Sequence, residues 1–236
     1  MTAARLRELH VPGKPLMLPN AWDADTAQLV VEAGFPAVAT SSYAVAAVLG
    51  YGDGEKAPAE EMFAAAARIA RVVSVPVTVD AESGYGLPAA EFVERLLATG
   101  AVGCNLEDTD HARGQPRSIS EQADFLAAVR EAAGDELVIN ARTDLFLGDV
   151  DRRARLPEAI ERAQAYLRAG VDCVYPIAIR SADLLEEFVR AVSPAAVNGN
   201  RIGDADLGSL GVARISLGAG LWRDTRSWLA AHLKEL

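Results

Sequence analysis

The sequence repeats one short pattern four times: a helical stretch ends in glycine and an apolar run follows at once. The four copies read "VVEAGFPAVAT", "LLATGAVGCNLED", "YLRAGVDCVYPIA" and "LGSLGVARISLG". Glycine readily adopts the left-handed backbone conformation that ends many helices, so Gly34, Gly100, Gly170 and Gly211 mark predicted helix ends. The runs after them are largely apolar, as expected for strands of a parallel sheet covered by helices on both faces.

Further apolar runs extend the alternation along the whole chain. They lie at 16–20, 76–82, 136–144 and 194–200. Helical patterns separate the runs at roughly 23–33, 57–73, 88–99, 119–133, 153–169, 182–191, 203–210 and 219–235. Eight alternations of strand and helix predict one (β/α)8 barrel domain over residues 1–236. An open doubly wound sheet is the alternative, but no G-x-G-x-x-G motif follows a strand.

Composition narrows the class of protein. A length of 236 residues suits one α/β barrel, and a net charge of −10 argues against nucleic acid or an anionic membrane surface as partner. The two cysteines, Cys104 and Cys173, each lie inside an apolar run, so neither a disulfide framework nor a zinc cluster is expected. We find no signal peptide and no run long enough to span a membrane, and therefore expect a cytoplasmic protein.

Polar side chains follow the predicted strands at their carboxyl ends, where barrel enzymes carry their active sites. Asn20 and Trp22, after the first strand, are candidates for substrate contacts. The other candidates at strand ends and in the loops beyond them are Ser41, Ser42, Tyr43, Asp53, Asp80, Glu82, Glu107, His111, Arg142, Asp144, Asn198, Asn200 and Ser216.

Four carboxylates in this set predict a cation site. In "VTVDAESGYG", Asp80 and Glu82 lie two residues apart and would point the same way if the extended backbone persists. Two such charges repel unless a cation or a proton compensates them, and Asp53 and Glu107 would join them at the same mouth. Oxygen ligands from several elements suit Mg²⁺, although Mn²⁺ is also compatible. Arg142 either clamps a substrate carboxylate or neutralises buried acids; position alone leaves both interpretations open.

The same residues carry a family resemblance. "LPNAWDADTAQLVVEAGFPAVATSS", "VTVDAESGYG", "NLED" and "INARTDLF" together resemble the isocitrate lyase/phosphoenolpyruvate mutase superfamily over most of the chain. The resemblance implies a (β/α)8 barrel that binds Mg²⁺ and a 2-oxo or enolic carboxylic acid. It also implies homodimers or homotetramers in which the last helix packs on a neighbouring subunit.

The resemblance further implies a role for each candidate. Asp80 resembles the direct metal ligand, and Glu82 stands where many members have aspartate. The carboxylates that would hold the waters of the metal are Asp53, Glu82 and Glu107. The residues that would contact the substrate are Ser41, Ser42, Tyr43, Arg142 and Asn198.

Two departures from the family pattern bear on the reaction. The segment after Glu107, "DTDHARGQPRSISEQ", is short and has no cysteine, unlike the gating loop of the isocitrate and methylisocitrate lyases. Ile177 stands where those lyases have glutamate. Decarboxylation through a metal-stabilised enolate needs no side-chain base to start it, whereas retro-aldol cleavage does. Tyr43, His111 or a metal-bound water could serve as that base, although a loop histidine is more often merely solvated.

The leading hypothesis is therefore a Mg²⁺-dependent carbon–carbon lyase for a small 2-oxo or 2-hydroxy di- or tricarboxylic acid. One alternative is a mutase or hydrolase acting on the phosphorus–carbon bond of a phosphonopyruvate-like substrate. Another is a barrel that binds a 2-oxo acid without turnover. In the C-terminal segment, Leu221, Trp222, Leu229 and Leu233 lie largely on one helix face, which suits either a partner subunit or the chain's own barrel.

Overall fold

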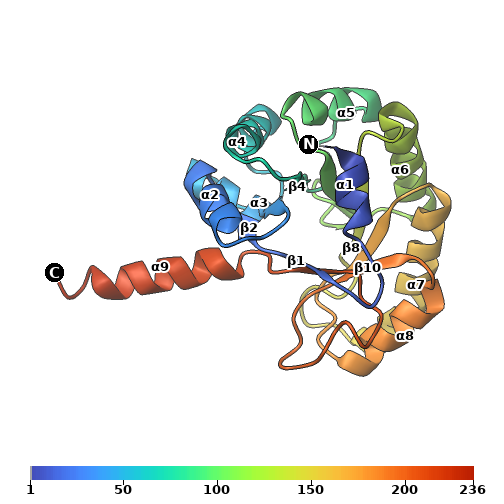
Figure 1. The fold of residues 1–236 in the computed structure, drawn as a ribbon. Helices are drawn as coiled ribbons and strands as arrows, with labels where there is room; N and C mark the ends of the chain where they lie inside the picture. The colour runs from blue at the N-terminus through green and yellow to red at the C-terminus, as the bar shows by residue number, and fades with distance from the viewer. Residues whose placement is uncertain (1) are drawn as a thin grey trace.

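Parallel strands form a ring at the centre of the molecule, and helices surround it (Figure 1). The structure is a computed structural model that describes residues 2–236. Each strand of the ring pairs in parallel with its neighbours. In sheet order the strands are β1 (Leu16–Leu18), β11 (Arg214–Ser216), β10 (Ala196–Gly199), β9 (Cys173–Pro176), β8 (Val138–Thr143), β5 (Gly103–Glu107), β4 (Val77–Asp80), β3 (Val38–Thr40) and β2 (Asn20–Ala21).

The two ends of this order are adjacent in the chain, and this adjacency closes the barrel. Pro19 separates β1 from β2 and has no N–H to donate, so the strand is interrupted there. Its carbonyl still accepts a hydrogen bond from the Ala39 amide at 3.2 Å. β1 pairs with β11 and β2 pairs with β3. The two pieces therefore act as the single first strand predicted at 16–20, and the predicted (β/α)8 barrel is confirmed.

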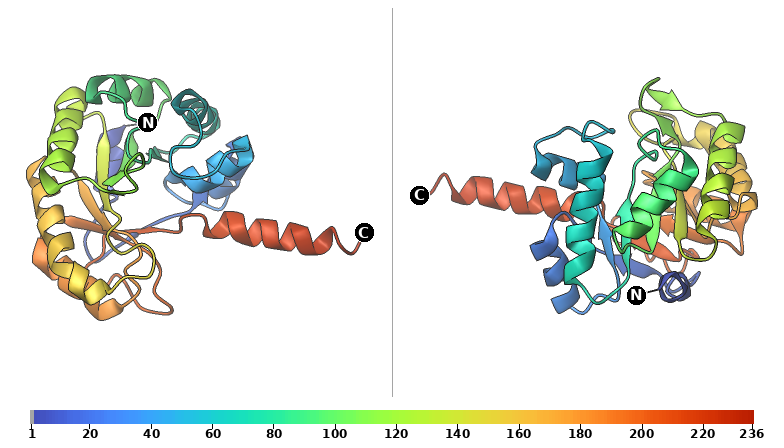
Figure 2. Two further views of the ribbon diagram at one scale, coloured as in Figure 1. Left: turned by 180° about the vertical axis from the view of Figure 1, so that it is seen from behind. Right: turned by 90° about the horizontal axis from the view of Figure 1, so that it is seen from above.

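Helices alternate with the strands and cover the outside of the ring (Figures 1 and 2). A short antiparallel hairpin, β6 (Thr109–Asp110) with β7 (Gln115–Pro116), follows β5. The helices are α1 (Ala3–Glu8), α2 (Ala24–Glu32), α3 (Ser42–Leu49), α4 (Ala59–Val72), α5 (Ala89–Ala98), α6 (Ile119–Ala133), α7 (Arg152–Arg168), α8 (Ala182–Val192) and α9 (Gly220–His232).

The helix α1 lies across one end of the barrel (Figure 1). Its Leu6 is fully buried in an apolar cluster with residues of β1 and β3. The backbone of Gly103, at the start of β5, approaches closely: a Cβ there would lie 2.7 Å from Leu6 Cδ2. Packing of α1 thus fills the amino-terminal end of the ring and leaves the carboxyl ends of the strands for a site.

The predicted elements include neither α1 nor the β6–β7 hairpin, and two further segments differ from them. Residues 203–210, predicted as a helix, form turns instead, because the Asp206 carboxylate accepts the backbone N–H groups of Gly208 and Ser209 and competes with helical bonding. The helix α3 was not predicted. Its signals are present, since Ser41 caps its start and Gly50, at φ +91°, ends it.

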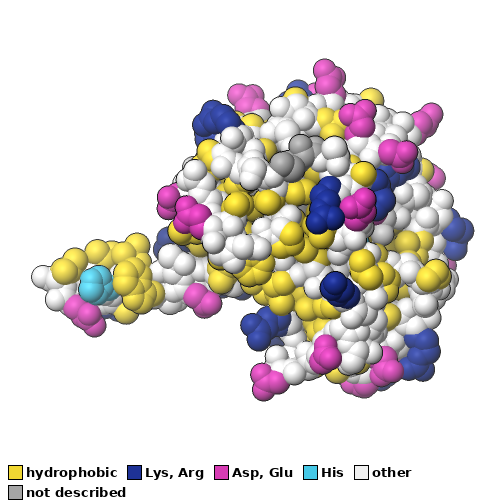
Figure 3. Space-filling view, in the orientation of Figure 1, with side chains coloured by type: hydrophobic (Ala, Val, Ile, Leu, Met, Phe, Trp, Pro, Cys, Tyr) yellow, Lys and Arg dark blue, Asp and Glu magenta, His cyan; other side chains and the backbone are white. Residues whose placement is uncertain are grey.

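The last helix, α9, extends away from the barrel (Figures 1 and 2). None of its residues is buried, so the alternative in which α9 packs on the chain's own barrel does not hold. Apolar side chains lie along the projecting segment in the space-filling view (Figure 3). Leu221, Trp228, Leu229 and Leu233 are exposed there.

The length and polarity of the helices bear on membrane association. Across residues 2–236, no helix combines the length and apolar character needed to cross a bilayer.

Candidate active site

A cavity of about 570 Å³ opens at the carboxyl ends of the barrel strands. Ser41 follows β3, Asp80 ends β4, Arg142 lies in β8 and Tyr175 in β9, and all four line the cavity. Asn200 lines it just beyond β10. Side chains from distant parts of the sequence therefore meet over one mouth, because parallel strands present their carboxyl ends on the same side.

Asp80 is held in place by the start of α3. Its Oδ2 accepts hydrogen bonds from the Ser42 amide at 3.0 Å and the Ser42 hydroxyl at 2.7 Å. The same hydroxyl lies 3.5 Å from Oδ1 of Asp53, so Ser42 links the two acids. The other Asp80 oxygen, Oδ1, is buried and has no hydrogen-bond partner among the described residues. A buried carboxylate oxygen without a partner is costly unless a cation compensates it.

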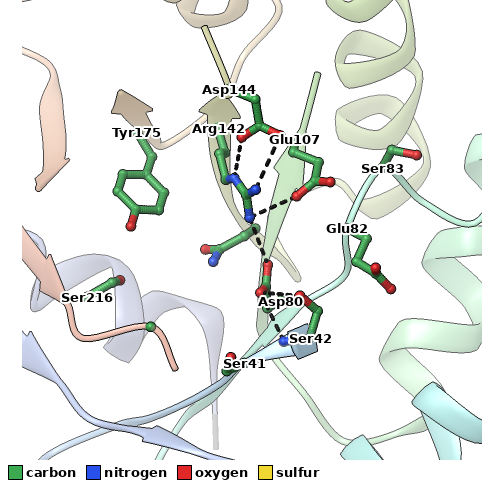
Figure 4. A network of polar contacts seen from close by, with 12 residues as sticks. Ser41, Ser42, Asp80, Glu82, Ser83, Glu107, Arg142, Asp144, Tyr175 and Ser216 are labelled. Carbon is green, nitrogen blue, oxygen red and sulfur yellow. Dashed lines mark hydrogen bonds and ion pairs between the residues drawn. The ribbon is translucent and has the colours of Figure 1, made fainter. Parts of the chain in front are cut away.

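Arg142 lies among three carboxylates (Figure 4). Its Nε contacts Asp144 Oδ1 at 2.6 Å and its Nη2 donates to Asp144 Oδ2 at 3.2 Å. Nη1 lies 2.8 Å from Glu107 Oε2 and 3.9 Å from Asp80 Oδ1. Burial alone would lower the pKa of Arg142, but Asp144, Glu107 and Asp80 outweigh it and raise the pKa well above its usual value. The fork of the guanidinium therefore faces Asp144, a partner that sequence reasoning did not assign.

Glu107 uses both of its carboxylate oxygens. Oε2 faces Arg142, and Oε1 lies 2.7 Å from Nε2 of His111 in the β6–β7 hairpin. Burial raises the pKa of Glu107, and the hydrogen bond to Glu107 raises the pKa of His111. His111 does not line the cavity. The pair thus ties the short hairpin to the end of β5.

Glu82 faces the loop that carries Asp53. Its Oε1 accepts the amides of Gly54 at 3.0 Å and Glu55 at 2.6 Å. In return, Glu55 Oε1 accepts the Ser83 amide and hydroxyl and the Tyr85 amide, at 2.6–3.1 Å. Burial raises the pKa of Glu82 to about 7, and the charges of Asp80 and Asp53 add to the rise. This reciprocal set of bonds, here called the Glu82–Glu55 latch, fixes the loop beside Asp80.

These acids suit a hydrated cation better than a closed metal cage. Among residues 2–236, no group of three or more His, Cys, Asp or Glu side chains is arranged to hold a metal ion directly. Mg²⁺ keeps several waters and uses only one or two carboxylates. The unpartnered Oδ1 of Asp80, with Asp53 linked through Ser42 and Glu107 linked through Arg142, fits that pattern.

Three other predicted substrate contacts lie outside the cavity lining. Asn20 is buried and its amide oxygen accepts the Leu217 and Gly218 N–H groups. Trp22 packs against the apolar cluster of α3 and α4. Asn198 is fully buried within β10 and donates to the Ser216 hydroxyl at 3.0 Å. These three side chains support the barrel rather than face the cavity.

Sequence reasoning missed several cavity residues. Tyr175 lies in a run that looks apolar, and its hydroxyl accepts a hydrogen bond from Asn200 Nδ2 at 2.7 Å. Three arginines also line the cavity: Arg180, Arg201 and Arg223. Their position after strands β9, β10 and β11 was a usable signal, since each lies in a segment that must pass over the mouth.

The cavity contains no thiol. Cys104 and Cys173 are fully buried in strands, and burial raises the pKa of both, that of Cys173 to about 12. Neither can supply the acid/base function of a gating-loop cysteine.

Comparison with known proteins identifies the family. The family model described as phosphoenolpyruvate phosphomutase matches residues 6–236. The chain belongs to the phosphoenolpyruvate mutase/isocitrate lyase superfamily. The superfamily member 2-methylisocitrate lyase of Escherichia coli is 34% identical over 206 residues, which cover 78% of this chain and 68% of that enzyme. An uncharacterized protein of Mycobacterium tuberculosis is 32% identical and covers 90% of this chain and 81% of its own length.

Solved structures agree with this assignment. A Burkholderia cenocepacia protein named a "putative phosphonomutase" has 40% identity and a TM-score of 0.92, with 99% of each chain covered. A phosphoenolpyruvate phosphomutase from Streptomyces platensis has 26% identity and a TM-score of 0.86, covering all of this chain and 87% of that one. The resemblance noted in the sequence is confirmed, and the relatives are lyases and mutases, so the chain is an enzyme of this superfamily.

Proposed function

We propose that this enzyme is a Mg²⁺-dependent carbon–carbon lyase for a small 2-oxo or 2-hydroxy di- or tricarboxylic acid. The observation that carries the proposal is the buried Oδ1 of Asp80, which has no hydrogen-bond partner among the described residues and lies 3.9 Å from Arg142 Nη1. Asp80 would hold the cation directly, with Asp53 and Glu107 acting through its waters. When bound, the cation supplies Lewis-acid stabilisation of negative charge on substrate oxygens.

The remaining cavity residues bind and orient the substrate in this proposal. Ser41, Ser42 and Tyr43 form the first turn of α3 and line the same wall as Asp80. Arg142 is buried and always charged, so it contributes a fixed positive charge near the developing anion even though its fork contacts Asp144. It also contacts Glu107 at 2.8 Å and lies 3.9 Å from Asp80, the acid that lines the cavity.

Of the two predicted side-chain bases, Tyr43 lines the cavity but its ring contacts the Arg223 guanidinium, so we favour decarboxylation, which needs no base to start it, over retro-aldol cleavage. Burial raises the pKa of Tyr175 to about 12, so its hydroxyl stays protonated near neutral pH. His111 contacts Glu107 outside the lining. Loss of CO₂ from a β-oxo acid needs charge stabilisation, which this site can supply, and no initial proton removal.

Asp80→Asn tests the proposal, with Asp25→Asn as its matched control. Asp25 is an exposed aspartate in the first turn of α2 and is not part of the cavity lining. We expect Asp80→Asn to lower turnover of an accepted 2-oxo diacid by at least about 100-fold. Chelation should abolish wild-type activity and Mg²⁺ should restore it. If turnover is unchanged in Asp80→Asn and is also unchanged when the wild type is treated with chelator, the metal-dependent lyase is refuted.

Phosphorus–carbon chemistry is the second candidate, because the matching family model and several structural relatives carry phosphomutase names. Phosphorus-31 NMR on phosphonopyruvate decides between the two. New phosphorus resonances that depend on enzyme and Mg²⁺ would favour a mutase or hydrolase. A static spectrum, together with release of CO₂ or a smaller acid from a carboxylic substrate, would favour the lyase.

We also propose that the enzyme is a homo-oligomer assembled through α9. The support is that none of the α9 residues is buried and that Trp228 is 65% exposed, a costly display of apolar surface for an isolated subunit. Light scattering at micromolar concentration should give a multiple of 24.9 kDa. Leu229→Glu with Leu233→Glu should shift the mass toward the monomer; a wild-type monomer would refute this proposal.

A further inference from the structure

Three arginines line the cavity in addition to Arg142. Arg180 lies four residues beyond β9, Arg201 follows Asn200 beyond β10, and Arg223 lies in the first turn of α9. All three side chains are exposed. Across residues 2–236, none of the three forms an ion pair.

This arrangement contrasts with the other arginines near the site. Arg142 and Arg162 each contact carboxylates of the protein, so their charge is already compensated. The chain as a whole carries a net charge of −10 and offers many acidic partners. Three uncompensated cations at one cavity in such a chain are available to bind an anion from solution.

The contacts of Arg223 hold it toward the cavity. Its guanidinium carbon lies 5.1 Å from the centre of the Tyr43 ring, a cation–π contact, and Tyr43 packs edge-on against Trp222 with ring centres 5.5 Å apart. Tyr43 itself belongs to the wall that carries Asp80. The three arginines, here called the rim arginines, therefore line the same cavity as Asp53 and Asp80.

Besides these charged groups, apolar side chains also line the cavity. Leu147, Ile177, Ile179, Ile202 and Leu217 contribute to it. An apolar wall reduces competition from water for a charged ligand group and so strengthens its contact with a guanidinium.

We propose that Arg180 and Arg201, together with Arg223, bind a second anionic group of the substrate. The cavity then selects 2-oxo acids with a distal carboxylate or phosphonate over the corresponding monoacids. This inference rests on the proposed function only for the end of the substrate that meets Asp80 and Arg142. Guanidinium groups bind both kinds of anion through paired charge-assisted hydrogen bonds.

Ligands that differ only at the distal group test the proposal. Oxaloacetate and phosphonopyruvate each carry a second anion, whereas 2-oxobutanoate has the same 2-oxo acid end and a methyl group instead. Affinities are measured with Mg²⁺ present by rapid-mixing fluorescence, before any turnover. We expect at least one diacid to bind wild type about tenfold or more tightly than 2-oxobutanoate. Comparison of the two diacids assigns the distal group as carboxylate or phosphonate.

The double variant Arg180→Gln/Arg201→Gln should lose most of this preference while its affinity for 2-oxobutanoate stays within about twofold of wild type. Arg68→Gln is the matched control, because Arg68 is exposed on α4, has no ion pair among the described residues and lies outside the cavity. The preference should also shrink with added salt, since exposed charges are screened. A preference that survives the double variant, or its absence in wild type, overturns the proposal.

Asp80→Asn separates this inference from the proposed function. Loss of the cation should lower the binding affinities for oxaloacetate and 2-oxobutanoate by similar factors, so the ratio of the two affinities should stay unchanged. If Asp80→Asn has no effect on either ligand while the double arginine variant removes the ratio, the metal-dependent lyase fails and the distal anion site stands. If Asp80→Asn weakens both ligands and the double variant changes nothing, the distal anion site fails and the lyase stands.

Discussion

His10 gives the chain a pH-dependent stability that can be isolated by one substitution. The imidazole lies just after α1, where it is 9% exposed, and its Nδ1 lies 2.8 Å from the Leu6 carbonyl. Its Nε2 is buried and has no partner among the described residues. Burial, together with the nearby charge of Arg214, lowers the pKa of His10 from 6.5 to about 4. The folded protein therefore keeps this ring neutral.

The sign of the effect follows from the two pKa values. Above pH 6.5 the ring is neutral in both states and contributes nothing to the pH dependence. Between pH 6.5 and about 4 the unfolded chain binds a proton that the folded protein refuses, so the free energy of unfolding falls as the pH falls. At about 1.4 kcal/mol for each pKa unit, the free energy of unfolding decreases by about 3 kcal/mol in total as the pH falls from 6.5 to about 4.

His10→Asn removes the titrating ring and keeps an amide donor near the Leu6 carbonyl. Urea unfolding of both proteins near pH 7 and near pH 4.5 gives the measurement. The stability difference between wild type and variant should change by about 2 kcal/mol between these conditions, in favour of the variant in acid. Glu82, Glu107 and His111 also titrate, but they are present in both proteins and cancel. Parallel pH profiles for the two proteins would refute the reasoning.

Three further substitutions test the packing around the site and the barrel end. Glu55→Ala should break the Glu82–Glu55 latch, cost about 1–3 kcal/mol and speed amide exchange in the turn after β4, read by mass spectrometry. Asp108→Ala should cost about 3–5 kcal/mol in urea unfolding, because it removes the buried carboxylate that accepts from the Asp144 amide, Arg162 and the Tyr166 hydroxyl, whereas Asp108→Asn should cost less. Gly103→Ala should cost about 1–3 kcal/mol by pressing on Leu6, and simultaneous Leu6→Val should recover part of it.

Much of the barrel could be predicted because local chemistry sets the ends of its elements. Gly34, Gly100, Gly170 and Gly211 all adopt positive φ, from +86° to +91°, as the repeated pattern requires. Helices α2, α5 and α7 end just before Gly34, Gly100 and Gly170, whereas Gly211 follows turns, and a strand of the barrel comes after each of the four glycines. The error at 203–210 arose because the Asp206 side chain satisfies the backbone locally, which hydrophobic periodicity does not register.

The candidate site was predictable in its location and less so in its contacts. Strand ends gather on one side of a barrel, so Asp80, Glu107 and Arg142 had to approach one another. The sequence did not show where along β10 the strand ends and the cavity begins. Asn198 and Asn200 lie two residues apart and so share a face in an extended strand, yet only Asn200, just beyond β10, lines the cavity. The partners of Arg142 depend on side-chain and loop conformations, which the sequence pattern does not specify, whereas the positions of Arg180, Arg201 and Arg223 after their strands could have been used.

The base of α9 joins two regions that the helix otherwise separates. Trp222 and Arg223 contact Tyr43 at the cavity wall, while Trp228, Leu229 and Leu233 lie exposed farther out. A change in the orientation of α9 would therefore be transmitted through Trp222 and Arg223 to Tyr43, which lines the cavity. Subunit assembly through α9 would be thermodynamically linked to ligand affinity, and by reciprocity a bound ligand would alter the dissociation constant of the assembly. If the subunits assemble in this way, the affinity of the cavity for its ligand would depend on protein concentration.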